Sequence, residues 1–494
     1  MSGSKGSNKI QYQKLSRFFA APPRRHSSLA LVRNLAIAGA LALSLPPLSA
    51  NALTLKDAIA IAVESNPEIG ASIENREAID FELRQAHGLR MPRIDLEAST
   101  GVRRLDNPSR RLSGTENRSL TPTEASLLMT LPLFDSGRIS SEIARQASRV
   151  DGAALRVLER SEFIGLQIAR EYFDILLQNR IVSLARENVQ VHERILGEIR
   201  EAEQGGALTA ADTLQAMERV VANRARLLEA EEELSAAKTR FENLVGVPVN
   251  QVFMPPSVRN VLPRSLDDAI GLARRNNPRL LMADADVAAA DAVKRAAKAE
   301  HGPELFLEGR ARAGSNLDGV RGRSTDLQGR VVFRMNLYDG GINSASYQEQ
   351  IRRASEERFR RLQAYRDIEE ATRLAWDRRR FQSQILAEFR QQLDYSNRVV
   401  SSYEEQFEVG RRSLLDVLDA YNTRYNTSVL TQTAEFAIAF ADYRLLAATG
   451  DLIATLGVNA PQQSQSGARQ AEGVPESSPA VTAPRQLPPR NPFR

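Results

Sequence analysis

The chain has 494 residues, of which 26% are charged and 6% are aromatic, and its formal net charge is +5. Basic and acidic residues are almost equal in number and are mixed along the chain, which favours a solvated helical surface over a nucleic-acid partner. No apolar run reaches the roughly eighteen residues of a membrane-spanning helix. Because the sequence contains no cysteine, we expect neither a disulfide framework nor a lipid anchor on an amino-terminal cysteine.

Residues 1–52 have the order of a secretory signal peptide. Basic residues between Lys14 and Arg33 precede an apolar stretch at 35–45, and small residues around Ala52 follow it. This order of basic, apolar and small segments predicts export, with cleavage after Ala52. We therefore expect the folded part of the chain to begin after this residue.

From Leu55 onward the chain repeats its own pattern about two hundred residues later. The match keeps one offset as far as Glu97 and a shorter one from Leu133, so a single loop differs in length between the copies. Such self-similarity predicts two repeats of one unit, at 53–250 and 266–458, with a linker at 251–265. The clearest matches pair Leu55, Asp57, Ala58, Asn66, Pro67, Asp135, Gly206, Asp212 and Gly246 with Leu266, Asp268, Ala269, Asn277, Pro278, Asp339, Gly410, Asp416 and Gly450.

Each repeat is predicted to contain two β-strands, because apolar and polar residues alternate in two of its segments. In the first segment, Ile94 and Leu96 alternate with Asp95 and Glu97. Strands of about ten residues with one apolar and one charged face are typical of transmembrane barrels. A half-buried soluble sheet is the alternative, but the export signal and the polar loops between the strands favour the barrel. The four segments are 92–104, 121–134, 303–314 and 325–338.

Four strands are too few to close a barrel, and lipid does not tolerate an open sheet edge. Several chains must therefore contribute strands to one shared barrel. The strand count alone leaves open whether two chains form a barrel of eight strands or three chains form one of twelve.

Two long helices follow the strands of each repeat. The first of each pair would be about 100 Å long at 1.5 Å per residue, longer than a compact globular domain needs. In the first repeat it carries small or β-branched residues at every seventh position, which indicates coiled-coil packing. The helices are predicted at 136–203, 209–245, 341–408 and 413–456, and the seams consist of Ala147, Ala154, Ser161, Ile168, Ile175, Val182, Val189 and Leu196, with Val150, Val157 and Ile164 alongside.

Residues 459–494 differ in composition from the repeats. They are rich in Pro, Gln, Ser and Ala and contain few large apolar residues. Such a segment cannot bury enough apolar surface to offset its conformational entropy. We therefore expect a disordered tail, which the family resemblance described below would place in the periplasm.

Nothing in the sequence indicates catalysis. There is no cysteine, the only histidines after the predicted signal peptide are His87, His192 and His301, and they do not form a metal-ligand pattern. No phosphate-binding glycine loop is present. We expect a protein that is not an enzyme and that uses neither a cofactor nor a metal.

Several motifs together resemble the TolC family of outer-membrane efflux and secretion channels. They are the duplicated Asn-Pro, the segments LFDSG at 133–137 and LYDGG at 337–341, and FEVGRRSLLDVLDA at 407–420. The resemblance covers about 53–458. Within the family, the chain is most similar to the type I secretion branch that exports repeat-rich adhesins and toxins, through NLDGV at 316–320, NLYDGG at 336–341 and LAW at 374–376.

The resemblance implies a mainly α-helical fold with a transmembrane β-barrel, assembled as a homotrimer. Its twelve-stranded barrel would lie among outer-membrane lipid and continue as a twelve-helix tunnel across the periplasm. The partners would be a periplasmic adaptor and an inner-membrane ABC transporter, and the channel would be a passive exit duct for an exported protein. One alternative is an efflux duct for drugs or metals with a proton-driven pump. Another, of a different class, is a periplasmic coiled-coil scaffold.

The resemblance also places the periplasmic entrance of the channel. Asp416 and Asp419 match family aspartates that form acidic rings in the pore. Arg412 matches an arginine that keeps the entrance closed, with Asp212 as the expected acceptor, whereas Phe407 replaces a tyrosine and so removes one closing hydrogen bond. The helical tips that would meet the adaptor contain Gly206, Leu208, Thr209, Gly410, Ser413 and Leu414.

Overall fold

The computed structural model describes residues 53–114, 116 and 118–475, which lie in one compact unit, Ala52–Arg494. The predicted signal peptide lies outside the described residues. Within them, no helix combines the length and the apolar composition that crossing a bilayer requires.

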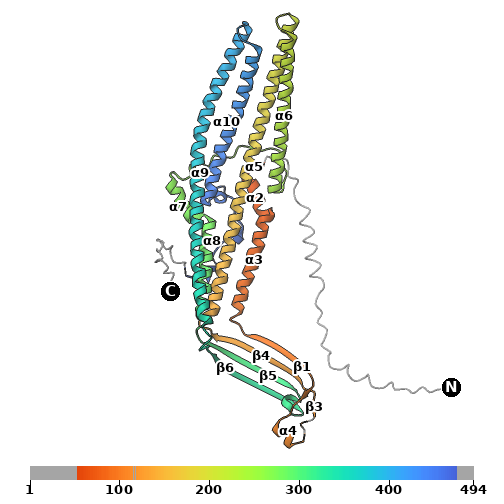
Figure 1. The fold of residues 1–494 in the computed structure, drawn as a ribbon, viewed down its shortest axis with the longest axis vertical. Coiled ribbons are helices and arrows are strands. Elements are labelled where there is room, and N and C mark those ends of the chain that lie inside the picture. The colour runs from red at the N-terminus through yellow and green to blue at the C-terminus, as the bar shows by residue number, and fades with distance from the viewer. Residues whose placement is uncertain (1–52, 115, 117, 476–494) are drawn as a thin grey trace, which may run out of the picture. The chain divides into compact units, whose positions relative to one another are not determined.

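The two repeats fold as the same series of elements (Figure 1). Equivalent helices have identical lengths of 11, 22, 67 and 36 residues. The first repeat contains α2 (Leu55–Ser65), α3 (Pro67–Gly88), β1 (Arg93–Thr100), β4 (Thr123–Phe134), α5 (Arg138–Gln204) and α6 (Ala210–Val245). The second contains α7 (Leu266–Asn276), α8 (Pro278–Ala299), β5 (Glu304–Ser315), β6 (Arg323–Arg334), α9 (Ile342–Glu408) and α10 (Leu414–Thr449).

Shorter elements connect these units. The loop between β1 and β4 contains β2 (Arg103–Arg104), α4 (Pro108–Leu112) and β3 (Ser119–Leu120). The linker between the repeats contains η2 (Arg259–Val261), and the loop between β5 and β6 contains η3 (Leu317–Gly319). The chain after α10 forms α11 (Leu452–Thr455), η4 (Gln462–Ser464) and α12 (Ala468–Ala471).

The duplicated Asn-Pro motif has the same structural role in both repeats. The Asn66 side chain accepts a hydrogen bond from the Glu68 backbone N–H and so caps α3, while Pro67 takes the first helical position. The Asn66 amide also donates to the Leu244 carbonyl at the end of α6, over 3.0 Å. Asn277 repeats both contacts at the start of α8. The motif therefore ties each short helix to the end of its long hairpin.

The four main strands form one antiparallel sheet in the order β1-β4-β5-β6. The register places Leu96, Leu127, Ala311 and Leu327 in one row across the sheet. Because side chains alternate along a strand, the next row, of Glu97, Ser126, Arg312 and Asp326, lies on the opposite face. The predicted separation into an apolar and a charged face is thus present, and within one chain β1 and β6 remain edge strands.

The charged face is stabilised by ion pairs between neighbouring strands. Glu308 on β5 binds Arg330 and Arg334 on β6, at 2.7 Å and 3.2 Å. Glu124 on β4 binds Arg312 on β5. These pairs keep charged groups compensated on the face that would line a barrel.

The heptad pattern of α5 corresponds to a buried seam. All of the predicted seam residues are at most 8% exposed. Along its first half α5 packs against α3 and α8, and along its second half against α6 and α10. The equivalent helix α9 buries far fewer side chains, and Phe381, Tyr395 and Val399 remain 51%, 55% and 41% exposed. One chain therefore leaves a long apolar surface of α9 without a partner.

The last long helix is shorter than predicted. Instead of continuing to residue 456, α10 ends at Thr449, because Gly450 adopts a left-handed conformation with φ of 80°. Gly246 ends α6 in the same way, with φ of 81°. The remaining residues of the predicted helix form the separate turn α11.

The prediction of a disordered tail is wrong for residues 459–475, which fold back onto the first repeat. Asp151 on α5, only 3% exposed, accepts hydrogen bonds from the backbone N–H groups of Gly467, Ala468 and Arg469. The Arg469 guanidinium also donates to this carboxylate, over 2.8 Å. A buried carboxylate far away in the sequence thus holds a segment whose composition alone favours disorder.

Replacing Asp151 by alanine should release this segment. The substitution leaves three backbone donors and a guanidinium without their acceptor, and each hydrogen bond to a charged group contributes about 1.5–3 kcal/mol. We expect trypsin to cleave after Arg469 at least about tenfold faster than in the unmodified protein, measured by mass spectrometry of timed digests. Glu187→Ala, an exposed change on the same helix, is the control. Equal cleavage rates in the two variants would contradict the anchoring role.

Candidate pore entrance at the helical tips

Each long hairpin ends in a turn closed by a glycine in the left-handed region. Gly206 has φ of 76° and Gly410 has φ of 74°. Behind them, the Ala207 N–H donates to the Ala202 carbonyl and the Arg411 N–H donates to the Gln406 carbonyl, at 2.8 Å and 2.9 Å. This geometry is a Schellman turn, in which glycine avoids the steric cost of a side chain. The two tips are therefore built alike.

The helices that leave the tips start with capping boxes. The Thr209 hydroxyl accepts from the Asp212 N–H, and the Asp212 carboxylate accepts from the Thr209 N–H over 2.9 Å. Ser413 and Asp416 repeat this exchange in the second hairpin. The hydrogen bonds from the Thr209 backbone and hydroxyl lower the pKa of Asp212. Asp212 and Asp416 thus fix the start of α6 and α10, a structural role that the sequence analysis did not assign to them.

An apolar cluster holds the two hairpins together just below the tips. It combines buried residues of α5, α6, α9 and α10, with Leu208 and Phe407 packed against its edge. Leu414, which the sequence analysis placed on the adaptor-facing surface, is only 5% exposed and belongs to this cluster. The exposed apolar side chains of the tips are instead Leu214, Val409 and Leu415, at 66%, 65% and 41%.

Asp416 and Asp419 both have exposed carboxylates, with side chains that are 45% and 58% accessible. They are not isolated charges. Arg219 on α6 lies 3.4 Å from Asp419, and Arg412 lies 3.8 Å from Asp416. Arg219 was not predicted as a site residue, because only the packing of α6 beside α10 brings it to Asp419. The acidic charge of the second hairpin is therefore partly compensated within one chain.

Arg412 makes a different set of contacts from the one expected. Its Nε donates to Gln406 Oε1 over 3.2 Å, and its guanidinium lies 4.0 Å from the centre of the Tyr403 ring. It does not pair with Asp212 within one chain, where that carboxylate accepts a hydrogen bond from the Thr209 hydroxyl over 2.7 Å. Tyr403 was also missed, although it lies one helical turn before Phe407 and so on the same face. The aromatic partner of Arg412 at the tip is thus Tyr403.

A buried polar layer crosses the hairpins next to the apolar cluster. Asn188 on α5 donates to Asn223 on α6 over 3.0 Å, and both side chains are less than 9% exposed. His192, 2% exposed, pairs its Nδ1 with the Asn188 carbonyl at 2.8 Å and contacts the Tyr421 ring on α10. Tyr421 in turn donates to Glu404 on α9. This layer links all four long helices through satisfied polar contacts.

The histidine makes this layer sensitive to pH. Burial lowers the pKa of His192, and the nearby charges of Arg219, Arg226 and Arg424 act in the same direction, whereas the Asn188 carbonyl opposes them. The folded form therefore binds protons more weakly than the unfolded form, whose pKa is about 6.5. The contribution of neutral His192 to the free energy of unfolding should therefore be fully present above about pH 6.5. It should decrease as the pH falls from there towards the lowered pKa of the folded form.

We expect the amides of 188–199 to exchange faster at pH 5.5 than at pH 7.5, after correction for intrinsic rates. The equilibrium constant for local opening of this segment should increase by up to about tenfold for each pH unit below 6.5. His192→Gln should remove this pH dependence, and His301→Gln, at an exposed position, should retain it. The same profile in all three proteins would exclude His192 as its source. Hydrogen exchange followed by mass spectrometry gives the measurement.

A protein-family model described as outer membrane efflux protein matches the chain. It covers residues 58–247 and 269–451 as two separate segments. The two segments coincide with the two structural repeats. They leave the linker and the residues after Asp451 outside the match.

Known relatives resemble the chain over most of its length. Outer membrane efflux protein BepC of Brucella suis is 24% identical over 67% of this chain and 73% of its own. Alkaline protease secretion protein AprF of Pseudomonas aeruginosa is also 24% identical, over 76% of this chain and 80% of its own. Among solved structures, the CmeC outer membrane channel of Campylobacter jejuni aligns with a TM-score of 0.70 at 16% identity, covering 93% of this chain and 98% of its own. This last likeness supports the fold.

Proposed function

The chain belongs to the outer membrane efflux protein family, and we propose that it is the exit duct of a type I protein secretion system. It lies in the outer membrane, with its helical part in the periplasm. The duct would make and break no chemical bond, and the energy for export would come from an inner-membrane ABC transporter reached through a periplasmic adaptor.

The open sheet is the observation that carries the channel assignment. Its four strands present one apolar and one charged face, and β1 and β6 are edges within one chain. Lipid does not tolerate such edges, so β6 of one copy would pair with β1 of the next. A homotrimer would close twelve strands, a number that leaves an aqueous interior lined by the charged face.

The exposed apolar stripes of the helices support the same assembly. On α6, Leu214, Val221 and Leu228 are seven residues apart and are 66%, 64% and 66% exposed. On α9, Leu374, Phe381 and Tyr395 share one heptad position and are 56%, 51% and 55% exposed, with Glu388 at the place between the last two. Such stripes require a partner helix. Packing of α6 against α9 of a neighbouring copy would continue the barrel as a helical tunnel.

The cargo is proposed to be a protein. The relative named for secretion of alkaline protease matches over slightly more of this chain than the relative named for efflux, and the NLDGV segment forms an ordered turn between β5 and β6. A drug or metal efflux duct is the second candidate, because BepC is as similar in identity. A periplasmic scaffold is disfavoured by the family and by the two-faced sheet.

We propose that Asp416 and Asp419 form acidic rings at the periplasmic entrance of the trimer. Their exposure and their place on one face of α10 support this proposal. A closing contact from Arg412 to Asp212 would then join neighbouring chains, because it does not form within one. The adaptor would contact the tips through Gly206, Thr209, Gly410 and Ser413, together with the exposed Val409.

The channel is tested by single-channel recording of the detergent-purified protein in planar bilayers, with the mass of the assembly determined on the same sample. Cation-selective pores from a trimer are expected. A monomer that never inserts would contradict the assignment. Deletion of the gene then separates the two kinds of cargo, because loss of a protein from the culture medium supports secretion, whereas increased drug or metal sensitivity with an unchanged medium supports efflux.

A further inference from the structure

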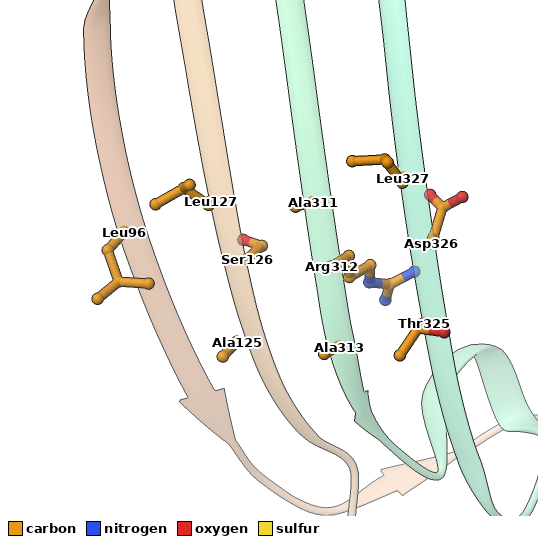
Figure 2. A pocket seen from close by; sticks show the side chains of 10 residues that line it. All are labelled: Leu96, Ala125, Ser126, Leu127, Ala311, Arg312, Ala313, Thr325, Asp326 and Leu327. Carbon is orange, nitrogen blue, oxygen red and sulfur yellow. The ribbon is translucent and has the colours of Figure 1, made fainter.

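The apolar face of the sheet contains a shallow hollow of about 550 Å³ (Figure 2). Its floor consists of Ala125 on β4 and Ala311 and Ala313 on β5, which are small side chains. Leu96 on β1 and Leu127 on β4 border it on one side and Leu327 on β6 borders it on the other, and these leucines are 74%, 43% and 85% exposed. The strand register thus creates an apolar furrow between two ridges of leucine on the face that contacts lipid.

A polar row closes the furrow at the end nearest the loops. Thr100, Thr123, Ser315 and Arg323 are aligned across the four strands and, by alternation, lie on the same face as the furrow. The hydroxyls of Thr100 and Thr123 are 3.3 Å apart. No carboxylate of the described residues lies within 4.0 Å of the Arg323 guanidinium. A guanidinium and three hydroxyls therefore stand directly above an apolar hollow.

The loops beyond this row are strongly basic. The segments 101–122 and 316–323 are held together by the Arg103–Asp318 ion pair at 3.9 Å and by the close approach of Leu105 to Gly319. Acidic residues in these segments are Asp106, Glu116 and Asp318, whereas the arginines are Arg103, Arg104, Arg110, Arg111, Arg118, Arg321 and Arg323. The positive charge is thus concentrated on one small part of a chain whose total charge is only +5.

The direction of the chain places this surface outside the cell. The opposite ends of β4 and β6 lead into α5 and α9, which lie in the periplasm, so the basic loops lie at the outer surface and the furrow lies in the outer-leaflet half of the sheet (Figure 1). We propose that this surface binds a phosphorylated glycolipid of the outer leaflet. One acyl chain occupies the furrow, and a sugar phosphate binds Arg323 and the neighbouring hydroxyls.

The charged, hydroxyl and apolar groups of this surface match the parts of a phosphorylated glycolipid. A guanidinium matches phosphate with two parallel hydrogen bonds, and hydroxyls suit a sugar headgroup. A glycerophospholipid of the inner leaflet would carry its phosphate at the other end of the strands, away from Arg323. An exported acidic protein would use the arginines but not the apolar furrow. The combination of the two features therefore favours a lipid with phosphate at the outer surface.

The test uses the purified, detergent-solubilised assembly and deep-rough lipopolysaccharide, with bound lipid counted by native mass spectrometry. Arg323→Gln should weaken binding by about tenfold, because it removes charged hydrogen bonds to phosphate. Ala311→Phe should reduce binding to a similar extent by filling the furrow. Arg264→Gln in the linker is the matched control for the charge. Val331→Phe, at an exposed position of the same sheet face but two rows nearer the helices than Leu327, is the control for the added ring. Both should bind as the unmodified protein does.

Four outcomes would overturn the proposal. Equal binding by Arg323→Gln and its control would exclude the phosphate contact, and equal binding by Ala311→Phe and Val331→Phe would exclude the furrow. Phosphatidylglycerol that binds as strongly as lipopolysaccharide would indicate general attraction of anionic lipid. Displacement of the glycolipid by millimolar inorganic phosphate would indicate a simple anion site. Retained assembly mass in each variant shows that the protein still folds.

Discussion

Replacement of both entrance aspartates by asparagine should remove most of the cation preference of the channel. Asp416→Asn with Asp419→Asn removes two charges from each chain while retaining an oxygen that can accept the capping hydrogen bond from Ser413. One pair of unit charges 4 Å apart in water already contributes about 1 kcal/mol, and three chains act together. We expect block by a trivalent cation to weaken by at least about tenfold in single-channel recordings at low salt.

Two further variants control this experiment. Asp377→Asn with Asp394→Asn makes the same charge change at exposed positions of α9 and should leave block unchanged. Arg219→Gln removes the cation that lies 3.4 Å from Asp419 and should strengthen block. If the double aspartate variant retains its selectivity, the acidic rings do not lie at the narrowest part of the pore.

The largest loss of stability is expected for Gly450→Ala. Both Gly450 and Gly246 have left-handed φ angles, where a side chain costs roughly 1–2 kcal/mol. A Cβ at Gly450 would also lie 2.8 Å from the Asn276 carbonyl oxygen and 2.9 Å from the Asn277 Cα, both backbone atoms. At Gly246 the nearest atom is Ser65 Oγ, at 4.0 Å. We therefore expect about 3 kcal/mol or more for Gly450→Ala and about 1–2 kcal/mol for Gly246→Ala.

The effects of Gly450→Ala and Gly246→Ala can be compared directly, because the two glycines occupy equivalent places in the repeats. The temperature at which the detergent-solubilised assembly dissociates should fall clearly further for Gly450→Ala than for Gly246→Ala. Similar decreases would mean that the backbone near Asn276 moves aside at little cost. An unfolded Gly450→Ala would agree with the prediction, provided that Gly246→Ala still assembles.

Periodicity predicted the regular elements well, because local patterns determine them. Alternation identified the strands and their two faces, and the seven-residue repeat identified the buried seam of α5. The sequence did not reveal the end of α10, although Gly246 and Gly450 match between the repeats and close equivalent helices. Because the first helix is predicted to end just before Gly246, the matching Gly450 would have predicted that α10 ends at Thr449.

Other features depend on contacts between distant residues and could not be read from local patterns. Asp151 binds a segment more than 300 residues away, so composition alone misjudged residues 459–475. Leu414 was assigned to a surface because it lies at a turn, whereas the facing hairpin buries it. Arg412 and Arg219 depend on which helices are neighbours, and their partners became visible only in three dimensions.

The equal lengths of the equivalent helices constrain how this protein can change its reach. A residue added to α5 alone would raise its tip by 1.5 Å and rotate it by about 100°, which would break both the match with α9 and the buried seam. A longer or shorter version needs whole heptads inserted at the same level in all four long helices. Matched single heptads would change the reach of the helical part from the sheet in steps of about 10 Å.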